Sequence, residues 1–259
     1  MGMHGPLTSM IGCNTRVVLG LYSVKFNFSC TTEGKISATR YIDLGLYKGP
    51  VEGGHEDMME FNYIYKLNSK MSKRKRPSSA EDLGYIYFFS KSKDPDYKYL
   101  SNFQITPEPL LFMGAPFRSI EHAFQAAKFL SLKGRKPAET ISLFLKFSTR
   151  GPYGGLDPAK VKSLGGKGSF KKEKVELDIK EWNRSAPLVM KELVVARCQV
   201  DPKYRHLLKN AAQKGIRFFH FERKGGLWGG NFPAGQTDVK SFRGENLLGY
   251  IMDHVAHSL

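Results

Sequence analysis

The hydrophobic pattern of the chain becomes regular only after residue 80. From Met1 to Lys70, short apolar stretches such as Arg16–Tyr22 lie among glycines and isolated charges, without a sustained helical or strand period. The next segment, Met71–Ala80, combines a basic cluster with proline and serine, which is typical of a flexible linker. We therefore expect residues 1–80 to form a poorly ordered N-terminal extension and residues 81–259 to form a single domain.

The first elements of the predicted domain are strands. An aromatic and β-branched run at Tyr85–Phe89 predicts a buried strand. Leu110–Met113 and Pro116–Arg118 lie on either side of Gly114 and Ala115, and this arrangement predicts a short hairpin.

Ser119 marks the start of a predicted amphipathic helix. Its hydroxyl is a favourable helix cap, and apolar residues follow at the spacing of one helix face: Ile120, Ala123, Phe124 and Ala127. Glu121, Gln125 and Lys128 therefore share a different face of the same helix.

The middle of the domain is predicted to alternate loops with helices. Gly151–Gly168 is a long glycine-rich loop, interrupted by a short helix at Asp157–Ser163, and loops of this length are often functional. A helix is expected over Lys172–Arg184. Pro187 interrupts the helical hydrogen bonding, so we expect it to begin a second helix that runs to Gln199.

The C-terminal part is predicted to contain two helices and a strand. A helix capped by Asp201 ends at Gly215, and a strand follows at Ile216–Glu222. A last amphipathic helix begins at Glu245 and directs five apolar residues to the core: Leu247, Leu248, Ile251, Met252 and Val255. The fold class predicted by these elements is helix-rich α+β with a small β component.

Composition narrows the class of protein. The chain has 259 residues, of which 41% are hydrophobic, and this length is enough to bury a full core. Its three cysteines are too few and too scattered for a disulfide framework, and no Cys/His spacing predicts a metal site. No apolar run approaches the roughly 20 residues of a membrane-spanning helix. We expect a cytoplasmic protein, with the basic run Lys73–Arg76 as an alternative nuclear address.

The net charge is +16, and the sequence pI is about 9.7. Such a charge raises the local concentration of anions and suits a phosphate-bearing or nucleic-acid substrate. Excess lysine and arginine on an ordinary solvated surface is the alternative interpretation.

Two regions in the first half of the domain carry candidate site residues. Glu121 lies in the first turn of its helix, where a carboxylate either serves chemistry or simply complements the helix dipole. Ser101, Asn102 and Phe103 lie in a loop between two predicted strands, and they offer small polar groups and an aromatic platform for a ligand.

Further candidates lie in the second half. Trp182 is either a core residue or a stacking wall. Trp228 precedes Gly229 and Gly230, whose N–H groups could hold a phosphate while the indole stacks on a base, although a tight turn also explains the glycines. Asn246 lies where the last helix is expected to open, which is either a capping position or an anion site.

The order of these features along the chain is specific. It runs Leu100–Phe103, Ser119–Lys128, Trp182, Trp228–Gly230, Gly244–Gly249. In this order the residues resemble the NADAR, or YbiA-like, family, and the resemblance covers about Tyr85–Leu259.

The resemblance implies an α-rich α+β domain that recognises ribose phosphates or ADP-ribose and cleaves an N-glycosidic bond. Members act on phosphoribosyl-aminopyrimidine intermediates of riboflavin synthesis or remove ADP-ribose from guanine. By this resemblance Glu121 is the catalytic glutamate and Trp182 the active-site tryptophan. We expect a monomer that needs no cofactor and whose partner is a ribose-phosphate or ADP-ribose-bearing substrate, with ADP-ribosylated nucleic acid included.

One stretch departs from the family pattern. Bacterial relatives carry an aspartate shortly before the Trp-Gly pair, whereas Glu222–Leu227 contains none. Either Glu222 or Asp238 replaces it, or the chain acts on a different substrate. The run His220–Arg223 is closer to eukaryotic and viral relatives, which weakens the case for a riboflavin intermediate.

The chemistry of C–N cleavage assigns further roles. Positive charge develops on the sugar and negative charge on the leaving base, so the site needs a carboxylate below the sugar and donors near the base. Glu121 fits the first requirement, Trp182 and Trp228 can hold the base, and Arg118 and Lys128 are candidate phosphate partners. The alternatives are a non-catalytic module that binds ADP-ribose or an NAD derivative, and a general nucleic-acid-binding protein.

Overall fold

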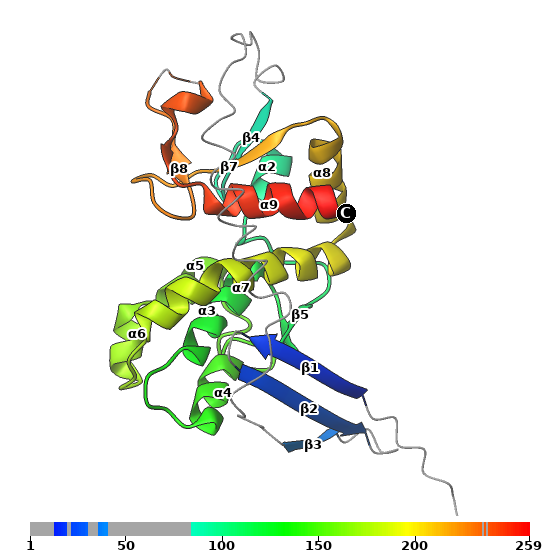
Figure 1. Ribbon diagram of the computed structural model, residues 1–259, viewed down its shortest axis with the longest axis vertical. Helices are drawn as coiled ribbons and strands as arrows, with labels where there is room; N and C mark the ends of the chain where they lie inside the picture. The colour runs from blue at the N-terminus through cyan, green and yellow to red at the C-terminus, as the bar shows by residue number, and fades with distance from the viewer. Residues whose placement is uncertain (1–12, 20–21, 31–35, 41–83, 235, 237) are drawn as a thin grey trace, which may run out of the picture. The chain divides into compact units, whose positions relative to one another are not determined.

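The computed structural model in Figure 1 describes residues 13–19, 22–30, 36–40, 84–234, 236 and 238–259. The chain forms two compact units, Met1–Glu60 and Phe61–Leu259. Within the described residues, no helix combines the length and the apolar character that a membrane span requires.

The described part of the first unit is a three-stranded antiparallel sheet. Its strands are β1 (Cys13–Leu19), β2 (Tyr22–Cys30) and β3 (Ile36–Arg40), in the order β1-β2-β3. The sequence showed no sustained helical or strand period before residue 71, whereas these three segments form strands. Apolar and polar residues alternate along β2, and this two-residue period was the missed signal. The predicted linker and the boundary at residue 80 lie outside the described residues.

The strands of the second unit are short. The central pair, β4 (Tyr85–Phe88) and β7 (Arg217–His220), is parallel, with Phe88 opposite His220. Both predicted strands are therefore confirmed.

The predicted hairpin is also confirmed. It consists of β5 (Leu110–Phe112) and β6 (Ala115–Phe117), joined by Met113 and Gly114. Both joining residues have positive φ, 51° and 74°, as a two-residue hairpin turn of type I′ requires. A last small pair follows near the C-terminus, formed by β8 (Gly230–Asn231) and β9 (Arg243–Gly244).

Helices are the main regular structure among the described residues of the second unit, and the predicted helix-rich α+β class is confirmed. In chain order they are α2 (Pro95–Tyr99), α3 (Ile120–Ala127), η2 (Lys128–Leu130), α4 (Pro137–Leu145), α5 (Pro158–Leu164), α6 (Lys167–Lys172), α7 (Ile179–Val200), α8 (Pro202–Gln213), η3 (Val239–Ser241) and α9 (Leu247–Ser258).

The prediction of two helices separated at Pro187 is wrong. Helix α7 begins after Asp178, whose carboxylate accepts a hydrogen bond from the Glu181 N–H at 3.0 Å, and it runs through Pro187 without a break. A proline inside a helix costs about 3 kcal/mol. Burial of Trp182 before the proline and of Leu193 after it offsets this cost, because both sides of the helix are fixed in the core.

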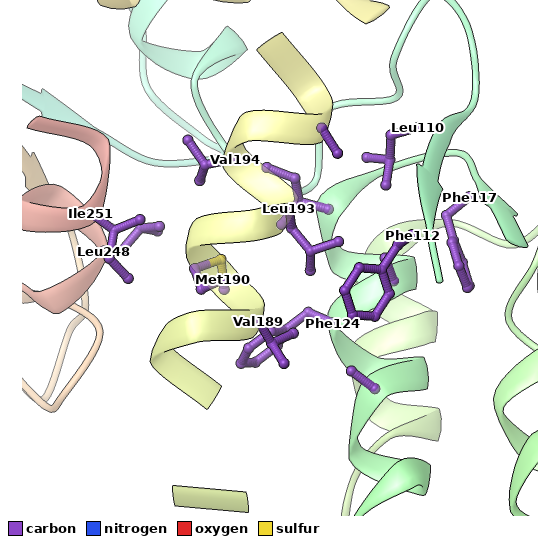
Figure 2. Close-up of a cluster of buried hydrophobic side chains, with 14 of the residues drawn as sticks. Leu110, Phe112, Phe117, Phe124, Val189, Met190, Leu193, Val194, Leu248 and Ile251 are labelled. Carbon is purple, nitrogen blue, oxygen red and sulfur yellow. The ribbon is translucent and has the colours of Figure 1, made fainter. Parts of the chain in front are cut away.

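Helix α7 forms the centre of the core, as Figure 2 shows. It packs against the β5 strand on one side and against α9 on the other. Leu193 lies near the hairpin residue Leu110, while Leu248 and Ile251 of α9 are on the opposite side. The five apolar residues predicted for the core face of the last helix are all buried.

Candidate active site

Helix α3 carries Glu121 into the interior of the domain. Ser119 caps the helix by accepting a hydrogen bond from the His122 N–H at 3.3 Å, as the sequence predicted. Glu121 lies in the first turn and is only 5% exposed. Its main-chain N–H donates to the carbonyl oxygen of Asn102 at 3.1 Å, which joins the helix start to the loop at residues 101–103.

A chain of hydrogen bonds follows one face of α3. Gln125 Nε2 donates to Glu121 Oε1 at 2.8 Å, and Lys128 Nζ donates to Gln125 Oε1 at 2.7 Å. Lys128 Nζ also donates to the carbonyl oxygen of Gly165 at 3.1 Å. The predicted shared face of Glu121, Gln125 and Lys128 is confirmed, and the amide links the carboxylate to the ammonium group.

Burial changes the acid–base properties of both ends of this chain. It raises the pKa of Glu121, while the Gln125 hydrogen bond and the charges of Lys162 and Lys128 act in the opposite direction. Burial also lowers the pKa of Lys128, against the effect of the Glu121 charge. Because water is largely excluded, a charge that develops beside these groups interacts with them strongly.

The glycine-rich loop closes over this face of α3. A Cβ atom at Gly165 would overlap Gln125 Oε1, so a glycine is required where the loop meets the hydrogen-bonded chain. The predicted helix in this loop is confirmed as α5, with Asp157 as its cap. It presents Lys162, whose Nζ lies 5.8 Å from the centre of the Phe103 ring.

Phe124 lies on the same helix as Glu121 and packs against two tryptophan rings. The Phe124 ring is 5.1 Å from the Trp182 ring and 5.2 Å from the Trp228 ring, measured between centroids. Phe124 thus brings together two tryptophans that are far apart in the sequence. Trp182 is 8% exposed and packs into the core.

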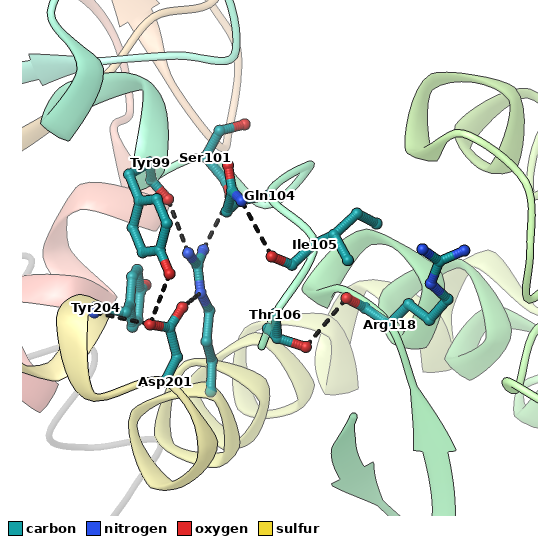
Figure 3. Close-up of polar contacts among 9 residues, drawn as sticks. Tyr99, Ser101, Gln104, Ile105, Thr106, Arg118, Asp201 and Tyr204 are labelled. Atoms are coloured by element: carbon teal, nitrogen blue, oxygen red, sulfur yellow. Dashed lines mark hydrogen bonds and ion pairs between the residues drawn. The ribbon is translucent and has the colours of Figure 1, made fainter. Parts of the chain in front are cut away.

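A buried ion pair holds the loop at residues 101–103. Arg197 Nε donates to Asp201 Oδ2 at 3.1 Å, and both side chains are fully buried. The guanidinium also donates to the carbonyl oxygens of Ser101 at 3.0 Å and Tyr99 at 2.8 Å. Figure 3 shows these partners around the guanidinium group.

One of the predicted binding residues, Asn102, has a buried Oδ1 atom without a hydrogen-bond partner.

The glycines after Trp228 are explained by close packing. A Cβ at Gly229 would lie 2.7 Å from His220 Nδ1, and one at Gly230 would lie 2.6 Å from the Phe242 ring. The predicted phosphate cradle therefore remains a proposal, since the tight approach accounts for these two residues by itself.

At the start of the last helix, where the sequence allows a capping position or an anion site, the side chain of Asn246 does not cap the helix. Helix α9 begins at Leu247 rather than Glu245, and its first two N–H groups donate to the carbonyl oxygens of Leu227 and Trp228. The side chain of Asn246 accepts from the His220 N–H at 3.0 Å and donates to the Phe218 carbonyl at 2.8 Å. These hydrogen bonds connect β7 to the start of α9, so Asn246 has a structural role.

The structure also shows the surroundings of Arg118, the predicted phosphate partner, and of the two acidic residues that could replace the family aspartate. Arg118 is exposed. Its charge adds to the effect of burial and lowers the pKa of His122, and it does not act on Glu121.

Two acidic residues are candidates to replace the missing family aspartate. Asp238 caps η3 by accepting a hydrogen bond from the Lys240 N–H, whereas Glu222 has a buried Oε2 atom without a hydrogen-bond partner.

Sequence reasoning missed Lys162, Gly165 and Arg197 as site residues. The only signal for the first two was the long glycine-rich loop. Arg197 gave no signal, because an arginine in an amphipathic helix is normally exposed. Across the described residues, no group of three or more His, Cys, Asp or Glu side chains is placed to bind a metal ion.

The geometry defines a helix-rich α+β domain with a buried carboxylate that is hydrogen-bonded to Gln125 and influenced by the charges of Lys162 and Lys128. The NADAR domain matches residues 88–259, and the chain belongs to this family. A comparison with curated proteins gives no match.

Proposed function

We propose that the protein hydrolyses the C–N bond between a base and the ribose of a ribose phosphate or ADP-ribose. The observation that carries this proposal is the buried Glu121 carboxylate, held by Gln125 and accompanied by the charges of Lys128 and Lys162. Membership of the NADAR family supports it, since glycosidase activity is associated with this family.

The proposed reaction uses Glu121 in two ways. As the C–N bond breaks, its electrons leave with the base and positive charge develops on the anomeric carbon, which the carboxylate stabilises. Glu121 then accepts a proton from the water that forms the new C–O bond and passes it to the departing base, which restores the carboxylate. A pKa raised by burial makes this carboxylate a stronger base than an exposed glutamate.

The neighbouring groups suit the rest of such a substrate. Lys128 and Lys162 supply positive charge for phosphate oxygens. Phe103 and Trp228 are partly exposed, so either ring can stack on a base or an adenine. Trp182 supports the site from the core side through Phe124.

ADP-ribosyl-guanine is the substrate we favour, and a phosphoribosyl-aminopyrimidine is the second candidate. The replacement of the bacterial aspartate and the buried Glu222 oxygen support a base that differs from the bacterial one. Incubation with ADP-ribosylated guanine DNA, and separately with a phosphoribosyl-aminopyrimidine, tests the proposal when the released base is followed by mass spectrometry. Binding of ADP-ribose without release from either substrate would instead indicate a non-catalytic module.

A further inference from the structure

The side chains on the inner face of β7 change from apolar to polar where the strand ends. Phe218, His220 and Glu222 are two residues apart, so they share one side of the extended chain. Phe218 is 1% exposed and belongs to the core. Phe219 and Phe221 point the other way and pack on further aromatic rings. The polar residues His220 and Glu222 therefore continue the core-facing side of the strand beyond the core.

Both of these polar side chains have a buried atom without a partner. Neither His220 Nδ1 nor Glu222 Oε2 forms a hydrogen bond with any residue that the structure describes. The Trp228 carbonyl raises the pKa of His220, but burial has the larger effect and lowers it to about 4. At neutral pH the imidazole is therefore uncharged, with one N–H donor and one acceptor nitrogen. Unpaired buried polar atoms cost free energy, and a ligand that hydrogen-bonds to them recovers it.

Two glycines leave the space in which these side chains lie. A Cβ atom at Gly229 would lie 2.7 Å from His220 Nδ1 and 3.2 Å from Glu222 Cβ. A Cβ atom at Gly226 would lie 2.9 Å from Glu222 Oε2. The imidazole and the carboxylate thus converge on one short segment of the chain, and we name them the His220–Glu222 pair.

The His220–Glu222 pair borders the candidate active site. Trp228 lies in the same segment, and its ring is 5.2 Å from the ring of Phe124, on the helix that carries Glu121. The charge of Lys162 acts on both Glu121 and His220. The pair therefore lies on the Trp228 side of the site, where the proposed function places the base.

We propose that the His220–Glu222 pair recognises the leaving base and selects one with a lactam edge, which is a ring N–H next to a carbonyl group. The carboxylate accepts a hydrogen bond from the ring N–H, the imidazole N–H donates to the carbonyl oxygen, and Trp228 stacks on the ring. Guanine has this edge, and its amino group adds a second donor for the carboxylate, whereas adenine has no ring N–H at the corresponding position. That this base is a leaving group rests on the proposed function, but the selection of its edge does not.

Calorimetric titration of the full-length protein with guanosine, inosine and adenosine 5′-monophosphates (GMP, IMP and AMP) tests the pair. The three nucleotides share the ribose phosphate and differ in the base, so a difference in affinity reports recognition of the base. IMP keeps the lactam edge and lacks the amino group. We expect the parent protein to bind GMP about tenfold or more tighter than AMP, with IMP between them.

The main variant is Glu222→Gln, which keeps the size of the side chain and replaces one acceptor oxygen with a donor. It should bind GMP about 10- to 100-fold more weakly, as expected for a hydrogen bond to a charged group, and should lose the preference over AMP. Gly226→Ala leaves Glu222 in the sequence but displaces its carboxylate, so a similar loss is expected. The matched control is Glu176→Gln, at an exposed glutamate, which should bind all three nucleotides as the parent does.

The variant His220→Phe tests the second half of the pair. It keeps an aromatic ring in contact with Phe88 and removes the ring N–H. We expect affinity for GMP and for IMP to fall about 2- to 10-fold, the range of a neutral hydrogen bond, with little change for AMP.

Three results would overturn the proposal. The first is equal affinity of the parent for GMP and AMP, and the second is a Glu222→Gln protein that keeps the parent's preference. The third covers a Glu222→Gln protein whose melting temperature falls far below that of the parent. In that case Gly226→Ala decides, and an unchanged preference for GMP in this variant would reject the pair.

Turnover of ADP-ribosyl-guanine separates this proposal from the proposed function. If the parent releases no base but its preference for GMP depends on Glu222, the glycosidase is rejected and the His220–Glu222 pair is retained. If the parent releases guanine and Glu222→Gln changes neither kcat, KM nor the preference for GMP, the pair is rejected and the glycosidase is retained.

Discussion

The main-chain N–H of Glu121 donates a 3.1 Å hydrogen bond to the carbonyl oxygen of Asn102, and this bond ties the proposed catalytic helix to a loop. The preceding residue, Ser101, is held through its own carbonyl oxygen by the buried guanidinium of Arg197. Arg197 is therefore a positioning residue for Glu121, although it lies on α7 and does not touch the carboxylate.

The first prediction concerns Arg197→Lys, which keeps the charge but cannot make the three hydrogen bonds of the guanidinium. We expect it to lower the free energy of unfolding by about 1 to 3 kcal/mol for each buried carbonyl oxygen, of Ser101 or Tyr99, that loses its donor. We also expect kcat to fall more than KM rises, since the loop no longer fixes Glu121. Denaturant unfolding and steady-state kinetics measure these two effects.

The matched control for Arg197 is Arg135→Lys, at a partly exposed pair with Glu139. An exposed pair contributes about 0 to 1 kcal/mol, so this change should alter neither stability nor turnover appreciably. If Arg197→Lys destabilises the fold but leaves kcat and KM of the folded fraction unchanged, Arg197 is structural only.

The second prediction uses the glycine that faces Gln125. In Gly165→Ala the new Cβ atom would overlap Gln125 Oε1 and displace the amide from Glu121 and Lys128. We expect turnover to fall at least tenfold, because the carboxylate loses its bound orientation. The control is Gly168→Ala, where a Cβ meets nothing within 4 Å, and this change should stabilise the fold by about 0.4 to 1 kcal/mol.

Turnover assays and melting temperatures on both glycine variants distinguish the outcomes. Parent-like turnover of Gly165→Ala would show that the Gln125 link between Glu121 and Lys128 has no part in the reaction.

The parts of the site that depend on local spacing were predictable from the sequence. Ser119 as a cap and Glu121, Gln125 and Lys128 on one face follow from three- and four-residue spacing within a single helix. Arg197 and Gly165 were not predictable, because their roles arise from contacts with segments that are far away in the chain.

In the fold, too, features with a local sequence signal were predictable, and features that depend on distant contacts were not. The strands at β4 and β7 and most helices carry their own local signals, whereas the continuity of α7 through Pro187 depends on packing from both sides. Local propensity predicts a break there, and tertiary burial outweighs it. The start of α9 was misplaced for a similar reason, since Asn246 is fixed by β7 rather than by its own helix.

The third prediction concerns acid sensitivity at His220, which packs on Phe88 with ring centroids 5.3 Å apart. Burial lowers the pKa of His220 from 6.5 to about 4. A depressed folded-state pKa gives stability that is present above pH 6.5 and is lost as the pH falls toward 4, up to about 3 kcal/mol. In His220→Gln this loss should disappear, so the melting temperature should depend less on pH across this window.

The control for the pH experiment is His206→Gln on α8, where the imidazole is exposed. Its pH dependence should match that of the parent protein, because His220 is unchanged in this variant. A profile for His220→Gln that is parallel to the parent between pH 6.5 and 4 would contradict the prediction.

The last prediction is that Glu121→Gln separates binding from chemistry. The amide keeps the size of the side chain and can still accept the hydrogen bond from Gln125, but it can neither balance charge at the anomeric carbon nor take a proton from water. Turnover should fall by about 10² to 10⁴, the range typical of general-base and electrostatic contributions. Affinity for ADP-ribose, measured by calorimetry, should survive.

Stability provides the second half of this test. Because burial raises the pKa of Glu121, the stability that the carboxyl group contributes is present below about pH 4.5 and is lost as the pH rises through the raised value. The melting temperature of Glu121→Gln should therefore be no lower than that of the parent at neutral pH.

The matched control is Glu139→Gln. Glu139 is also a first-turn glutamate, but it is exposed and lies on α4, so this variant should keep full turnover. A Glu121→Gln protein that is both inactive and strongly destabilised would assign Glu121 to the fold, and one with activity within a few-fold of the parent would remove it from the mechanism.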